Sequence, residues 1–139
     1  MSKVQLREEG RRLQAEDVTA NNTVAAADSG NVLNITKDAL VTTLPNITTS
    51  MVGLTVIVRL AGATPTTGTA GTGSNQSVGH EIAPHSSDKI SGAGVSGTAD
   101  KSLLMVKASQ EVGDYVILQA DGVDTWFVKE WSGSWTFEA

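Results

Sequence analysis

The only two histidines of this 139-residue chain, His80 and His85, lie close to Glu81, and both residue types are common zinc ligands. Side chains of an extended strand alternate between two faces, so two residues five positions apart point in opposite directions. Asp121 and Asp124 could supply two carboxylates of a calcium loop, but the sequence around them lacks the remaining oxygen ligands. A hairpin turn explains this second pair better. We therefore expect no metal site.

Residues 92–97 read G-A-G-V-S-G and match the G-x-G-x-x-G pattern of dinucleotide-binding loops. Such a loop binds pyrophosphate between a preceding strand and the N-terminus of a following helix. Here only Lys89-Ile90 precedes the glycines, and Thr98-Ala99-Asp100 leads to another strand, so a glycine-rich turn is the simpler interpretation. The Ser86-x-x-Lys89 spacing is that of some acyl-transfer enzymes, which need a helix to align the two side chains. No helix is predicted around this pair. We expect no cofactor and no catalytic site, and the absence of a nucleophile–base pair also disfavours a small β-fold hydrolase.

The aromatic residues are concentrated near the C-terminus. Five of the six lie within the last fourteen positions, namely Trp126, Phe127, Trp131, Trp135 and Phe137. Neighbours along a strand face opposite ways, so Trp126 and Phe127 cannot enter the same face of a sheet. One could fill the core while the other covers an edge, one face could pack against a sister subunit, or an exposed ring could stack on a sugar. We predict that this group forms the core or a subunit interface.

The elements that would position these residues are short strands joined by turns. Apolar or alternating runs predict strands at 32–35, 39–44, 54–60, 103–106, 114–120, 125–131 and 135–137. Asp121-Gly122 between two of these runs predicts a hairpin, because glycine tolerates the positive φ of such turns. Several short strands without a long helix predict an all-β fold, a single β-sandwich or jelly-roll-like barrel over residues 21–139.

Two segments depart from this pattern. Residues 1–20 are predicted to form an extended N-terminal arm, because the charge-dense part at 2–17 lacks a complete helical stripe and contains Gly10. Residues 61–79 form a long loop rich in Gly and Thr. Connections of this length are usually functional or disordered, and we expect this one to project from the domain or to lie on a neighbour.

Composition disfavours several kinds of partner. The formal net charge is −5 and cysteine is absent. The charges of the arm cancel, so the body carries the excess acid that would repel nucleic acid. The longest apolar stretch, 54–60, is interrupted by Arg59 and is too short to cross a membrane. The first residues lack the apolar segment of a secretory signal, so we expect synthesis in the cytoplasm without classical export.

Several of these segments resemble a recurrent β-domain of tailed-bacteriophage virion proteins, found in head decoration (cement) proteins, head fibres and some tail-fibre modules. The resemblance covers most of residues 27–137. The matching segments are 43–45, 53–56, 88–92, 113–118, 121–122, 126–128 and 133–135. Each is a structural signature and not a catalytic one, and the insertion at 61–79 departs from the compact pattern.

The resemblance implies a small homo-oligomer, typically a homotrimer, on the outer capsid surface of a virion. Its partners would be the major capsid protein and its own copies, and it would stabilise the shell. We then expect the arm to be the main capsid contact, through Lys3, Val4, Leu6, Arg7, Arg11, Arg12 and Leu13. The alternative is a receptor- or glycan-binding module of a phage tail or head fibre, which would use exposed aromatics and the long loop.

Overall fold

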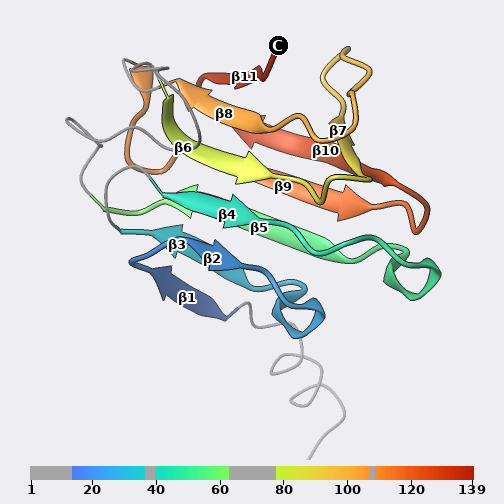
Figure 1. Ribbon diagram of the computed structural model, residues 1–139. Helices are drawn as coiled ribbons and strands as arrows, with labels where there is room; N and C mark the ends of the chain where they lie inside the picture. Colours follow the sequence, from blue (N-terminus) through green and yellow to red (C-terminus); the bar gives the residue numbers. More distant parts are fainter. Residues whose placement is uncertain (1–13, 37–39, 63–77, 107–108) are drawn as a thin grey trace, which may run out of the picture.

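The computed structural model describes residues 14–36, 40–62, 78–106 and 109–139 as two packed β-sheets, which confirms the all-β sandwich (Figure 1). The strands are β1 Ala15–Val18, β2 Asn22–Thr23, β3 Val32–Ile35, β4 Val41–Thr43, β5 Thr55–Leu60, β6 Val78–Ala83, β7 Lys89–Ser91, β8 Leu103–Val106, β9 Tyr115–Ala120, β10 Thr125–Ser132 and β11 Trp135–Phe137. Two single-turn 3-10 helices, Ala26–Asp28 and Thr49–Met51, lie in the connections. Neither helix in these ranges is long and apolar enough to cross a membrane.

The six-stranded sheet has the order β1-β3-β5-β9-β10-β7, and the five-stranded sheet has the order β11-β8-β6-β4-β2. From β1 to β9 the chain changes sheet at every connection. As a result, several neighbours within a sheet run parallel, including β1 with β3, β3 with β5, and β10 with β7. A jelly roll is built from antiparallel strands. Of the two predicted architectures, the chain therefore adopts the sandwich.

The core lies between the sheets and is formed by the inward side of each alternating strand. Val56, Val58 and Leu60 of β5 are buried, while Thr55, Ile57 and Arg59 point away from the core, as the alternation of this segment predicts. The largest fully buried side chains include Trp126, Leu33, Ile35, Leu44, Ile82, Ile90, Leu103, Met105 and Leu118. One contiguous apolar cluster therefore holds the two sheets together.

The seven strands predicted from the sequence correspond to β3, β4, β5, β8, β9, β10 and β11, with ends that differ by at most two residues. The sequence did not predict β1, β2, β6 and β7. Residues 132–134 carry the chain into the other sheet, where β11 pairs with β8. Val78 and Gly79, at the end of the predicted long loop, begin β6, and residues 63–77 lie outside the described residues.

Ala15–Val18, within the predicted arm, form β1 at one edge of the six-stranded sheet. The backbone N–H of Val32 donates to the carbonyl of Gln14 at 2.7 Å, and the N–H of Thr36 donates to the carbonyl of Val18 at 3.1 Å. These bonds close the β1–β3 pairing at both ends, so the chain is fixed to the sheet from residue 14 onward. Residues 1–13 lie outside the described residues.

Candidate binding groove and outer sheet face

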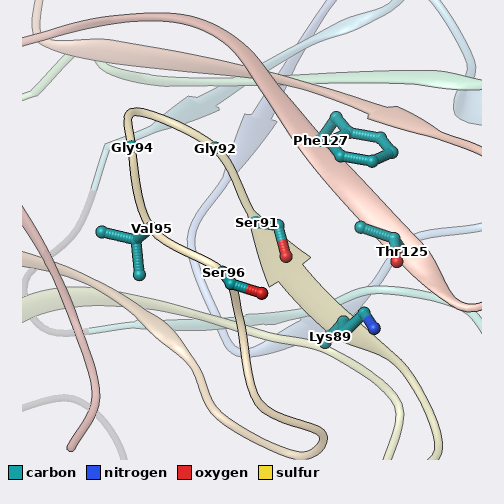
Figure 2. A pocket seen from close by; sticks show the side chains of 8 residues that line it. All are labelled: Lys89, Ser91, Gly92, Gly94, Val95, Ser96, Thr125 and Phe127. Atoms are coloured by element: carbon teal, nitrogen blue, oxygen red, sulfur yellow. The ribbon is translucent and has the colours of Figure 1, made fainter.

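An open groove lies at the end of the six-stranded sheet, where β7 pairs with β10 (Figure 2). Its volume of about 460 Å³ is within the range of small-molecule sites. The side chains that line it are Lys89, Ser91, Val95, Ser96, Thr125 and Phe127. The parallel register sets Lys89 beside Thr125 and Ser91 beside Phe127, so four of the six share the face of the sheet that points away from the core.

A tight hairpin forms the wall of the groove opposite β10. Gly92 and Val95 each donate a backbone N–H to the other's carbonyl at 2.9 Å. The two residues between them, Ala93 and Gly94, have φ of +49° and +83°, which is the conformation of a type I′ turn. An alanine at positive φ is unfavourable by about 1–2 kcal/mol, so the surrounding structure must hold it there. The two hydrogen bonds between Gly92 and Val95 therefore define this wall of the groove.

Phe127 presents its ring to this groove, and 47% of the residue is exposed, whereas the preceding Trp126 is fully buried in the core. Figure 2 shows the Phe127 ring and Thr125 on β10, with Ser91 and Ser96 on the side of the hairpin. The groove thus combines one accessible aromatic ring with several hydroxyl groups. Such a combination can bind a ligand that has both an apolar face and polar groups.

The one cation of the groove is already paired. The Lys89 Nζ lies 3.7 Å from the Asp124 Oδ2. The Thr125 hydroxyl donates to the other Asp124 oxygen at 2.7 Å. Because Asp124 balances the amine, the groove has no net positive charge to attract an anion.

The outer face of the six-stranded sheet has an apolar centre. Ile57 of β5 lies opposite Val32 of β3 on one side and opposite Ile117 of β9 on the other. Val32 is buried, and the two isoleucines are half-buried. This outer face, defined by Val32, Ile57 and Ile117, is a surface that a second protein could cover.

Polar side chains border that apolar centre. Arg59 donates from Nε and Nη2 to the Asn34 Oδ1 at 3.0 and 2.8 Å, and the Asn34 Nδ2 donates to the Asp17 Oδ1 at 3.4 Å. Tyr115 pairs with Arg59 in the next strand, and its hydroxyl donates to the Glu130 Oε1 at 2.6 Å. This hydrogen bond, helped by desolvation and the nearby negative charge, raises the pKa of Tyr115. An apolar centre with a satisfied polar rim is the usual anatomy of a protein interface.

His80 and His85 lie in different environments. His80 is fully buried, whereas His85 is exposed and its Nδ1 lies 2.8 Å from the Ser87 hydroxyl. Glu81 accepts a hydrogen bond from the Ser102 hydroxyl at 2.6 Å. Among the described residues, no three His, Asp or Glu side chains gather in a way that could hold a metal ion.

His80 belongs to a short chain of hydrogen bonds across three strands. The Thr42 hydroxyl donates to the Asn22 Oδ1 at 3.1 Å and lies 3.0 Å from the His80 Nε2. Because the hydroxyl proton is committed to Asn22, the ring donates from Nε2 and its Nδ1 carries no proton. Nδ1 is buried without a hydrogen-bond partner among the described residues. Desolvation by burial lowers the pKa of His80 to about 3.

The Asp121 carboxylate organises the β9–β10 hairpin. Its Oδ1 accepts backbone N–H groups from Val123, Asp124 and Thr125 at 2.7, 3.1 and 3.0 Å. Gly122 in the same turn has φ of +82°. Desolvation opposes ionisation of Asp121, but the backbone hydrogen bonds outweigh it and lower the pKa of this carboxyl. The three backbone hydrogen bonds explain why an aspartate stands at position 121 of the turn.

The five C-terminal aromatic residues divide between core and surface. Trp126 and Trp135 are buried in the core, and Phe127 is exposed beside the groove. Trp131 and Phe137 are half-buried, pack against the core cluster, and have ring centroids 6.3 Å apart. The arm residues predicted to contact a capsid, Lys3, Val4, Leu6, Arg7, Arg11, Arg12 and Leu13, lie outside the described residues.

Sequence reasoning did not predict the groove residues Lys89, Ser91, Ser96 and Thr125. It treated residues 92–97 as a glycine-rich turn, which they form, but it could not place this turn beside Phe127. The sequence signal that could have indicated the groove is the alternation of side-chain direction along a strand. Of Trp126 and Phe127, one must point away from the core. The pairing of β7 with β10 has no local signature.

Comparisons with known proteins identify no relative. No protein-family model, no curated protein and no solved structure matches the chain.

Proposed function

We propose that this protein is a non-enzymatic virion structural protein that binds the outside of a bacteriophage capsid and stabilises it as a homo-oligomeric decoration (cement) protein. It would be made in the host cytoplasm, and its partners would be the major capsid protein and its own copies. The proposal starts from the resemblance of residues 27–137 to phage virion β-domains.

The observation that carries this proposal is the attachment of the arm. Residues 1–13 lead directly into β1, which is hydrogen-bonded along its length to β3. Tension on the arm would act on two backbone hydrogen bonds at the same time. One joins Gln14 to Val32, and the other joins Val18 to Thr36. An arm that enters an edge strand can therefore transmit force to the whole sheet, which suits a protein that clamps neighbouring subunits.

Self-association would strengthen such a contact. A closed oligomer presents several arms at once, so weak contacts act at a high effective concentration. The arm carries Arg7, Arg11 and Arg12 beside Glu8 and Glu9, and mixed charges suit docking on a polar surface. The outer face around Val32, Ile57 and Ile117 is the surface that we propose for contacts between copies in a homotrimer.

The test is co-sedimentation with capsids that lack this protein. Deletion of residues 2–13 leaves β1 intact and should preserve the folded oligomer while reducing capsid binding at least tenfold. A matched control replaces residues 2–13 with a Gly/Ser segment of equal length, which keeps the chain length and removes the side chains. Undiminished binding of either variant would reject the role of the arm.

Two further measurements separate this proposal from the fibre alternative. Light scattering after size exclusion gives the oligomer number, and Ile117→Glu on the outer face should shift the protein to monomer. A decoration protein binds empty shells and not host cells. Adsorption to cells without binding to shells would favour the receptor-binding module instead.

A further inference from the structure

We infer that the groove beside Phe127 is a binding site for a neutral pyranose, such as a terminal residue of an oligosaccharide. This site goes beyond the proposed capsid contact and does not depend on it, because β1 and β7 form opposite edges of the six-stranded sheet.

The first step of the argument is the accessible ring. Phe127 leaves 47% of its surface exposed on β10, between β9 on one side and β7 on the other. The register fixes it beside Gln119 and Ser91. A flat aromatic face in an open groove can pack against the C–H face of a pyranose, and it needs no reorganisation to do so.

The second step is the polar surroundings of the ring. The Ser91 hydroxyl accepts the Gly97 N–H at 2.8 Å and keeps its own proton for another partner. Ser96 is exposed and lines the same space (Figure 2). Thr125 donates to Asp124 and keeps acceptor capacity. Ser91 and Thr125 are buried at the base of the groove and Ser96 is exposed on its wall, so the hydroxyl groups at the edge of a sugar ring would meet donors and acceptors at the base and on one wall.

The third step excludes other ligand classes. An anion is disfavoured because Lys89 is paired with Asp124. An added peptide strand is disfavoured because residues 97–100 already cover the free edge of β7: the Asp100 N–H donates to the Asp88 carbonyl at 3.0 Å, and Gly97 contacts the Ile90 carbonyl. A small neutral ligand with an apolar face and hydroxyl groups remains.

The groove is shallow, so one or two sugar units would be covered and the affinity would be low. We expect cellobiose to bind with a dissociation constant of roughly 1 mM. The measurement is a titration of the ¹⁵N-labelled full-length protein, followed by amide chemical shifts. The shifts should saturate and should map to Ser91, Ser96 and Phe127.

The variants use surface positions. Phe127→Ala should weaken binding at least tenfold, whereas Phe127→Tyr should keep it, because tyrosine retains the ring face. Val123→Ala is the matched control, since Val123 is 75% exposed in the hairpin turn and does not line the groove. The amide spectrum of each variant shows whether it is folded.

Two control ligands test whether the groove recognises the sugar ring or a negative charge. Sorbitol has the hydroxyl groups of a hexose without its ring, so it should give no saturable shifts. Glucose 6-phosphate should bind no better than cellobiose. The inference is overturned if cellobiose, chitobiose and lactose all fail to bind, if Phe127→Ala binds as well as the wild type, or if sorbitol or the phosphate ester binds better than the neutral sugars.

Discussion

Replacement of the buried His80 by glutamine should make the stability of the protein less sensitive to acid. In the folded protein the pKa of His80 is about 3, against 6.5 for a free histidine. The unfolded chain therefore gains a proton below about pH 6.5 that the folded chain cannot accept. A lowered histidine pKa contributes full stability above that pH, and the contribution is lost as the pH falls toward 3.

The size of the effect follows from those two pKa values. Between pH 7 and pH 5, the proton taken up by the unfolded chain reduces the free energy of unfolding by about 2 kcal/mol. That is a substantial part of the free energy of unfolding of a typical domain, which is roughly 5–15 kcal/mol. Carboxylates also titrate at low pH, so the informative quantity is the difference in pH dependence between wild type and variant.

The assay is urea unfolding followed by tryptophan fluorescence at several pH values between 7 and 5. His80→Gln keeps a donor for the Thr42 hydroxyl, and its stability should fall with pH about 2 kcal/mol less than that of the wild type. His85→Gln is the matched control at the exposed histidine. The free energy of unfolding of this variant should decrease with falling pH by the same amount as that of the wild type. If the His80→Gln variant is too unstable, the NMR shift of the His80 ring in the wild type should stay that of a neutral imidazole at pH 5. Equal pH dependence of wild type and His80→Gln, or a ring that titrates near pH 6.5, would refute the reasoning.

Substitutions at three further positions test the turns and loops of the fold. Asp121→Ala removes an acceptor of three backbone N–H groups and should lower the free energy of unfolding by about 1–3 kcal/mol at pH 7, whereas Asp121→Asn, which keeps the acceptor oxygen, should cost less. Because the pKa of Asp121 is lowered, the part of this contribution that depends on its charge is lost as the pH falls from the usual aspartate value of 3.8 through the lowered pKa of the folded protein, and the gap between the two unfolding curves should narrow there; a constant gap would contradict the role assigned to the carboxylate. Gly97→Ala would force a methyl group against the Ile90 carbonyl and should lower stability by about 1–3 kcal/mol in thermal unfolding. Gly113→Ala, where φ is +101° but the added methyl has open space, should cost about 1 kcal/mol, and a smaller effect at Gly97 than at Gly113 would show that the loop moves away from β7.

The fold class and seven strands could be predicted because their signal is local. Val56, Val58 and Leu60 alternate with outward residues, and Leu103–Val106 is a continuous apolar run. The missed strands lack such a signal. β1 reads Ala-Glu-Asp-Val and β7 reads Lys-Ile-Ser, and each becomes a strand only through its pairing with β3 or β10.

The candidate site was predictable only in part, for the same reason. Alternation requires that one of Trp126 and Phe127 faces outward, but which one depends on the sheet that packs behind β10. Ser91 and Ser96 lie near Phe127 because β7 pairs in parallel with β10. These two strands are separated in the sequence by β8 and β9, so no local pattern predicts the pairing. The buried His80 likewise finds its hydrogen-bond partner, Thr42, on the neighbouring strand.

The alternation of the chain between the two sheets also governs how the protein can fold. β9 inserts between β5 and β10, and Thr55 pairs with Gln119, so the six-stranded sheet cannot close until most of the chain has been synthesised. Closing such long loops before any pairing energy is gained makes folding slow. A nascent chain on the ribosome would present β5 and β6 with open edges, and open edges pair with other chains. The step most exposed to aggregation therefore comes before β9 and β10 arrive, and a truncation that removes this C-terminal hairpin would leave two incomplete sheets instead of a smaller domain.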